Sequence, residues 1–104
     1  METTSDTKAL FMIVNAGYAE ELIALVREVG IRGATVLNAR GEGACHESFL
    51  GITVDTEKEM LLCITDAETA QKAMAAIHEK MGLFTPAHCI CFSMPVEQTV
   101  GIST

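Results

Sequence analysis

ALFMIV, residues 9–14, is apolar at every position. An uninterrupted apolar run of this length with β-branched residues at its end predicts a strand that is buried on both faces. Asn15-Ala16-Gly17 breaks the run. Residues 1–8, which precede it, are mostly small or polar, so we expect a flexible N-terminal arm at 1–8 and a single domain over residues 9–104.

Two amphipathic segments separate this strand from the others. From Tyr18 onward the apolar residues recur at helical spacing, and Gly30 stands where a left-handed helix terminator belongs. A second helix is predicted to begin after Asp66, a good N-cap residue, and to end at Gly82. The apolar stripe of the first helix consists of Leu22, Leu25, Val26 and Val29, and that of the second of Ala70, Ala73, Met74, Ile77 and Met81.

Three further strands are predicted at residues 34–39, 60–64 and 89–92, and residues 99–102 are expected to add a short C-terminal edge strand. The order is strand, helix, strand, long loop, strand, helix, strand. Right-handed crossovers in both halves give a four-stranded antiparallel sheet with two helices on one face. The expected fold class is therefore α+β, with a ferredoxin-like βαββαβ arrangement.

The apolar strands raise a question of burial, because two helices can cover only one face of a sheet. The runs at 11–14 and 60–64 are apolar on both faces. If the second face were exposed to solvent, it would form an apolar patch larger than monomeric proteins usually have. A second copy of the same chain is the simplest candidate to cover this face. We therefore expect a homo-oligomer whose sheets face inward.

Composition excludes several classes of function. The chain has 104 residues, of which 49% are hydrophobic, and a formal net charge of −7. This acidic balance argues against nucleic-acid binding, and no apolar run approaches the ~20 residues that span a bilayer. The start of the chain lacks the order of a signal peptide, which favours a cytoplasmic protein. Cys63, Cys89 and Cys91 lie in apolar runs and are expected to be reduced core thiols.

One segment resembles a known family. Gly30-Ile31-Arg32-Gly33-Ala34-Thr35-Val36, followed by Arg40-Gly41-Glu42-Gly43, is similar to the nitrogen-regulatory PII family, and this chain resembles a divergent member with a short loop. The resemblance covers roughly residues 10–102. It implies a non-enzymatic signalling protein, a homotrimer that binds adenine nucleotides between subunits, and a loop at 41–56 that contacts a target protein.

The resemblance also implies the residues of a nucleotide site. Gly33 and Thr35 would lie near the adenine, beside the backbone of Cys63 and Ile64, and Gly41 and Gly43 would open the loop. The turn from Gly82 to His88 would occupy the place of the phosphate-binding turn. The implied nucleotide-binding residues are Gly33, Thr35, Gly41, Gly43, Cys63, Ile64, Gly82 and His88.

That turn differs from the family's glycine-rich turn. It reads Gly82-Leu83-Phe84-Thr85-Pro86-Ala87-His88, in which His88 takes the place of a Lys and Pro86 lacks an N–H donor. No Lys or Arg follows Lys80. The expected effector is therefore a less charged adenine nucleotide such as AMP or ADP; another small molecule, or no nucleotide at all, is the alternative.

Two other functions compete with this one. Cys45 and His46 in the loop, together with His88, carry soft donor atoms, so a metal- or redox-responsive trimer is an alternative. An interaction module with a decayed ligand site is the other. Catalysis is not expected, because His46, His78 and His88 have no recognisable partner by spacing.

Overall fold

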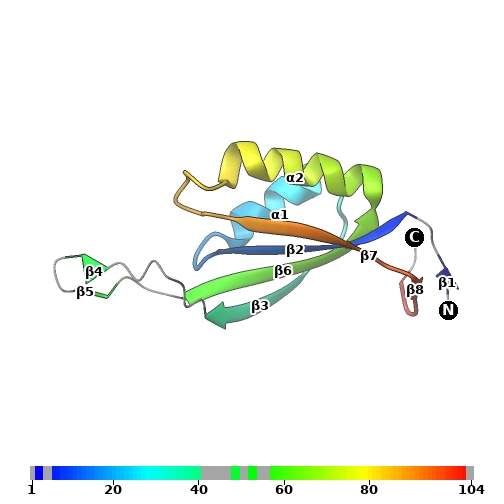
Figure 1. Cartoon of the computed structure of the whole chain (residues 1–104), viewed down its shortest axis with the longest axis horizontal. Coiled ribbons are helices and arrows are strands. Elements are labelled where there is room, and N and C mark those ends of the chain that lie inside the picture. The colour runs from blue at the N-terminus through cyan, green and yellow to red at the C-terminus, as the bar shows by residue number, and fades with distance from the viewer. Residues whose placement is uncertain (1, 4–5, 41–47, 50–51, 54–56, 103–104) are drawn as a thin grey trace.

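The chain is described by a computed structural model that covers residues 2–3, 6–40, 48–49, 52–53 and 57–102 (Figure 1). The two helices are α1 (Ala19–Glu28) and α2 (Ala67–Met81). The long strands are β2 (Thr7–Asn15), β3 (Thr35–Arg40), β6 (Glu57–Asp66) and β7 (Ile90–Pro95). The short strands are β1 (Glu2–Thr3), β4 (Ser48–Phe49), β5 (Ile52–Thr53) and β8 (Gln98–Thr99).

The four long strands form one antiparallel sheet in the order β3-β6-β2-β7. Both helices lie on the same side of this sheet (Figure 1). The predicted α+β fold class is confirmed, including the βαββαβ order, the four antiparallel strands and the two helices on one face. Neither described helix is long and apolar enough to cross a membrane.

The helix ends follow the local sequence. Gly30 has a φ of +110°, the left-handed conformation that a glycine adopts easily, and it ends α1 as predicted. Asp66 caps α2: its carboxylate accepts a hydrogen bond from the Thr69 backbone N–H at 3.1 Å. The Thr69 hydroxyl donates to the same carboxylate at 2.6 Å. The first of these bonds satisfies a backbone N–H that the first turn of a helix leaves without an intrahelical partner.

The hydrophobic core fills the space between the sheet and the helices. Alternate residues of β2, namely Leu10, Met12 and Val14, are fully buried there. The helix stripes meet them with the side chains that the spacing predicted: Leu22, Leu25, Val26, Ala73, Ile77 and Met81. The intervening residues of each strand point to the other face, which no described helix covers.

Two details at the chain ends differ from the sequence-based expectation. Strand β2 begins at Thr7, and Thr7 and Lys8 pair with Asp66 and Thr65 of β6, so these two residues belong to the sheet and not to the flexible arm expected at 1–8. The short C-terminal strand exists at Gln98–Thr99, but it pairs with β1 and not with an edge of the main sheet. The main ladder of β7 ends at Pro95, after which the Val96 N–H donates to the Thr7 carbonyl at 3.0 Å.

The capping of α2 predicts how stability depends on pH. Hydrogen bonds from Thr69 hold the pKa of the Asp66 carboxyl below its ordinary value of 3.8. A carboxylate with a lowered pKa in the folded state stabilises the protein above the unfolded pKa, and this contribution is lost as pH falls through and below 3.8. We expect Asp66→Ala to lower the Tm at pH 7, with a smaller difference from the wild type below about pH 3.

Asp66→Asn is the matched control, since Asn is as good an N-cap as Asp but does not titrate. Thermal melts followed by circular dichroism at neutral and at acid pH should show this variant close to the wild type at neutral pH. An equal Tm for Asp66→Ala and the wild type at neutral pH would show that the cap contributes nothing.

Candidate functional site

The face of the sheet opposite the helices is apolar and open. Phe11 and Phe92 lie opposite each other on β2 and β7, and their rings stack with centroids 5.0 Å apart. Phe92 remains 43% exposed and Ile90 54% exposed. The two-sided apolar pattern read from the sequence is therefore present in the structure as an uncovered face, formed by Phe11, Ile13, Leu37, Met60, Leu62, Ile64, Ile90, Phe92 and Met94.

A pocket of about 760 Å³ lies at one edge of this face. We call it the Gly33 pocket. The connection from α1 to β3 forms one wall, and the end of β6 forms another. It is lined by Asp6, Thr7, Gly30, Arg32, Gly33, Ala34, Thr35, Leu62, Ile64, Thr65, Asp66 and Ile102.

Three of the predicted site residues meet in the Gly33 pocket. Gly33 and Thr35 are exposed on the connection and on β3, and Ile64 is half-buried on β6. Thr35 pairs with Leu62, which also lines the pocket. The Cys63 side chain, by contrast, points into the core and is 1% exposed, so that only its backbone lies beside the others.

Gly82 and His88 are not part of this pocket. Their turn is attached to the far end of β2, where the Asn15 N–H donates to the Ala87 carbonyl at 3.0 Å and Asn15 Nδ2 donates to the Pro86 carbonyl at 2.8 Å. Asn15 and Thr7 lie at opposite ends of this extended strand, a span of about 26 Å. One subunit therefore holds the two groups of predicted residues at opposite ends of its sheet.

Part of the backbone of the turn is hydrogen-bonded within the chain. The N–H groups of Thr85 and His88 donate to the carbonyls of Gly82 and Thr85, each at 3.1 Å, and that of Cys89 donates to the Met81 carbonyl at 2.7 Å. Pro86 has no N–H to offer. The turn thus provides fewer free donors for an anion than a glycine-rich nest would.

Gly82 has a structural reason to be glycine. A Cβ added at this position would lie 2.6 Å from the carbonyl oxygen of His78 in the last turn of α2. His88, in the position of the family's Lys, has a φ of +44°, a conformation that is uncommon for a residue with a side chain.

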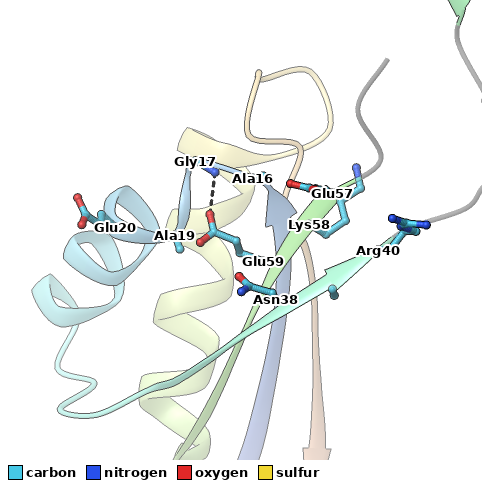
Figure 2. Close-up of a pocket in the computed structure, with 10 residues that line it drawn as sticks. Ala16, Gly17, Ala19, Glu20, Asn38, Arg40, Glu57, Lys58 and Glu59 are labelled. Atoms are coloured by element: carbon cyan, nitrogen blue, oxygen red, sulfur yellow. Dashed lines mark hydrogen bonds between the residues drawn. The ribbon is translucent and has the colours of Figure 1, made fainter. Parts of the chain in front are cut away.

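A second pocket, of about 690 Å³, lies at the loop end of the sheet (Figure 2). Glu59 reaches from β6 toward α1, and its Oε1 accepts a hydrogen bond from the Gly17 N–H at 2.7 Å. Lys58 Nζ donates to Asn15 Oδ1, which ties the ammonium group to the residue that holds the turn. Arg40 ends β3 on the same side. Sequence analysis missed Lys58 because its proximity to the turn arises only from the pairing of β6 with β2.

The three described cysteines are free thiols, as predicted: Cys63 and Cys89 are buried in the core, and Cys91 packs against it. Burial raises the pKa of Cys63 and of Cys89 to about 11. Burial, with the nearby Cys89 and Cys63, raises the pKa of Cys91 to about 12. These thiols are protonated at neutral pH, and a protonated thiol is a poor nucleophile and a poor metal ligand.

Several predicted residues lie outside the described part of the chain. These are Gly41 and Gly43 at the start of the loop and Cys45 and His46 of the metal alternative. Within the loop at 41–56, the backbones of β4 and β5 pair as a short antiparallel ladder. Among the described residues, no three His, Cys, Asp or Glu side chains are grouped so that they could hold a metal ion.

Comparison with models of known protein families shows which family the chain belongs to. The family model described as "Nitrogen regulatory protein P-II" matches residues 7–104. The chain belongs to this family. The PII resemblance inferred from residues 30–43 is therefore confirmed, and with it a signalling protein that is not an enzyme.

Solved structures of PII proteins share the fold at low sequence identity. A PII-like signalling protein from Thermus thermophilus is 20% identical, with a TM-score of 0.67 over 86% of each chain. CPII from Thiomonas intermedia K12, bound to ADP, AMP and bicarbonate, is 15% identical, with a TM-score of 0.69 over 92% of this chain and 96% of that one. PII from Arabidopsis thaliana, bound to citrate, is 20% identical, with a TM-score of 0.67 over 89% of this chain and 79% of that one. Comparison with curated proteins gives no significant match.

Two of the four glycines of the predicted site, Gly33 and Gly82, allow a direct test of their roles. Gly82→Ala brings a Cβ against the backbone of α2, and we expect it to destabilise the protein by about 1–3 kcal/mol. Gly33→Ala meets no atom within 4 Å and should leave stability unchanged. Urea denaturation of both variants measures the difference. A Gly82→Ala protein as stable as the Gly33→Ala protein would contradict the structural role of Gly82.

Proposed function

We propose that this PII-family protein is a homotrimer that binds a small effector, an adenine nucleotide such as AMP or ADP, in clefts between subunits. It signals occupancy to a target protein through the loop at 41–56. The physical basis is a loop with two states, whose ordering depends on contacts with the ligand. The proposed location is the cytoplasm, in keeping with the buried, reduced thiols.

The observation that carries the proposal is the separation of the predicted site into two parts. Gly33, Thr35 and Ile64 line a pocket at one end of the sheet, whereas Gly82 and His88 belong to the turn attached to Asn15 at the other end. A ligand of nucleotide size cannot span about 26 Å of strand. Two copies of the chain, arranged head to tail, bring the pocket of one beside the turn of the next.

The uncovered apolar face supports the trimer. Phe92, Ile90 and Met94 on β7 are each about half exposed, and they continue across β2 to residues of β6. Burial of apolar area at roughly 25 cal/mol per Å² favours association of such faces. Head-to-tail contacts between identical subunits close into a ring when the rotation allows it.

The charges favour an effector with few phosphates. In the lining of the Gly33 pocket, the positive charge of Arg32 is outnumbered by the negative charges of Asp6 and Asp66. At the other end, Lys58 and Arg40 share their pocket with the carboxylates of Glu20, Glu57 and Glu59. A triphosphate would meet little net positive charge in either place, whereas one or two phosphates could be held by Lys58 at the base of the turn.

The bound ligands of related structures agree with this class of effector. CPII of Thiomonas intermedia is bound to ADP, AMP and bicarbonate, and Arabidopsis PII is bound to citrate. All of these are small anions. We extend the nucleotides to this chain because Gly33 and Thr35 form a pocket of suitable size on the open face.

Calorimetric titration with AMP, ADP and ATP tests the proposal. We expect saturable binding of AMP and ADP that is tighter than that of ATP. Thr35→Ala removes a hydroxyl from the Gly33 pocket and should weaken binding roughly tenfold, the effect of losing one hydrogen bond of about 1.4 kcal/mol. The oligomeric state is measured by light scattering on the same samples, with a trimer expected.

Ser93→Ala is the matched control, since it removes an exposed hydroxyl on β7 outside the pocket. It should bind nucleotide like the wild type. Complete indifference of the wild type to all three nucleotides would refute the nucleotide proposal, and a monomer would refute the site between subunits.

A further inference from the structure

The turn after α2 carries an apolar knob, formed by Leu83 and Phe84. Phe84 is 98% exposed and Leu83 is 62% exposed, and they are consecutive residues of the turn. Single exposed apolar residues are common on protein surfaces. Here two apolar residues are exposed side by side, and the Phe84 side chain is almost as accessible as in an extended peptide. Such a pair is typical of a surface that binds another molecule.

The Gly33 pocket has the complementary chemistry. Its lining includes the apolar side chains of Ala34, Leu62, Ile64 and Ile102. Its volume of about 760 Å³ can hold an aromatic ring together with a small ligand. Leu62 and Ile64 also belong to the open apolar face of β6, so the pocket is continuous with the surface that the proposed trimer covers.

The knob and the pocket cannot meet within one subunit. The knob's turn is hydrogen-bonded to Asn15, whereas the pocket contains Thr7 at the other end of the same strand, about 26 Å away. Figure 1 shows the turn between α2 and β7 at the end of the sheet opposite the chain termini. A knob at one end and a hole at the other is the arrangement that joins identical subunits head to tail.

The charges beside the two surfaces do not carry the proposal. The last turn of α2 carries both Glu79 and Lys80 shortly before the knob, and their charges offset each other. The pocket carries Asp6 and Asp66 against Arg32, and hydrogen bonds from Thr69 lower the pKa of Asp66, which keeps it ionised. The match between knob and pocket therefore rests on apolar surface and not on charge.

We propose that Phe84 of one subunit inserts into the Gly33 pocket of the next and forms part of the wall of the effector site. The inference rests on the proposed function, because it requires a second copy of the chain. It gives the divergent turn a new role: an aromatic side chain contacts the ligand beside a turn in which Pro86 has no N–H to donate. Each subunit then contributes a pocket to one neighbour and a knob to the other.

A tryptophan at the knob reports whether it is buried. The chain contains no tryptophan, so Phe84→Trp introduces a single fluorophore. In the assembled protein we expect blue-shifted emission and slow quenching by iodide, with a further change on addition of AMP or ADP. Val36→Trp is the matched control, because Val36 is an exposed apolar residue on β3 that faces away from the open apolar face. Its emission should not respond to nucleotide.

Truncation of the knob measures its contribution to the ligand site. Phe84→Ala should weaken AMP and ADP binding by roughly tenfold, the usual effect of losing one aromatic contact to a base. Val36→Ala should leave the affinity unchanged. Light scattering on every variant establishes whether the trimer persists.

The outcomes separate this inference from the proposed function. If the Phe84→Trp protein is a trimer that binds nucleotide while its fluorophore is quenched as freely as tryptophan in solution, the role of Phe84 is overturned and the proposed function stays intact. A trimer with a shielded fluorophore and no nucleotide binding would support the insertion of the knob but refute the nucleotide effector. A monomer with an exposed fluorophore would overturn both.

Discussion

The rest of the structure depends on one constraint: a four-stranded sheet that is apolar on both faces has only two described helices to cover it. The covered face is close to complete, since Leu10, Met12 and Val14 of β2 have no exposed surface. The opposite face carries the stacked pair Phe11 and Phe92, of which Phe11 is half-buried and Phe92 is 43% exposed. The fold of the subunit and the proposed association of subunits therefore rest on the same feature, the unbroken apolar runs of β2 and β6.

This constraint also explains where a ligand can bind. The Gly33 pocket lies at the edge of the open face, and its apolar wall is made by Leu62 and Ile64, which belong to that face. A pocket so placed is open in one subunit, and in the proposed trimer a neighbour that covers the sheet would enclose it. Ligand binding and subunit association would then share residues, which is the physical condition for coupling between them.

Much of the fold could be predicted because its signals are local. The apolar runs, the Asp66 cap and the terminating Gly30 each act within a few residues, and each is observed as predicted. Strand ends were less accurate: β6 begins at Glu57 and ends at Asp66, well beyond the apolar core at 60–64, because pairing with β2 continues through polar residues. The pairing of β8 with β1 depends on the path of the chain after Pro95, which no local pattern indicated.

The candidate site was less predictable because it depends on distance in space. Gly33, Thr35 and Ile64 line one pocket, yet Gly82 and His88 lie at the far end of the sheet, and Lys58 approaches their turn only through strand pairing and Asn15. The turn itself shows how a divergent sequence can keep a fold and change a site. A Cβ at Gly82 would collide with the carbonyl oxygen of His78, so the presence of this glycine says little about phosphate binding. Leu83 and Phe84 give this turn exposed apolar surface, and Pro86 removes one backbone N–H donor. The proposed insertion of Phe84 into a neighbouring pocket would remove that apolar surface from water.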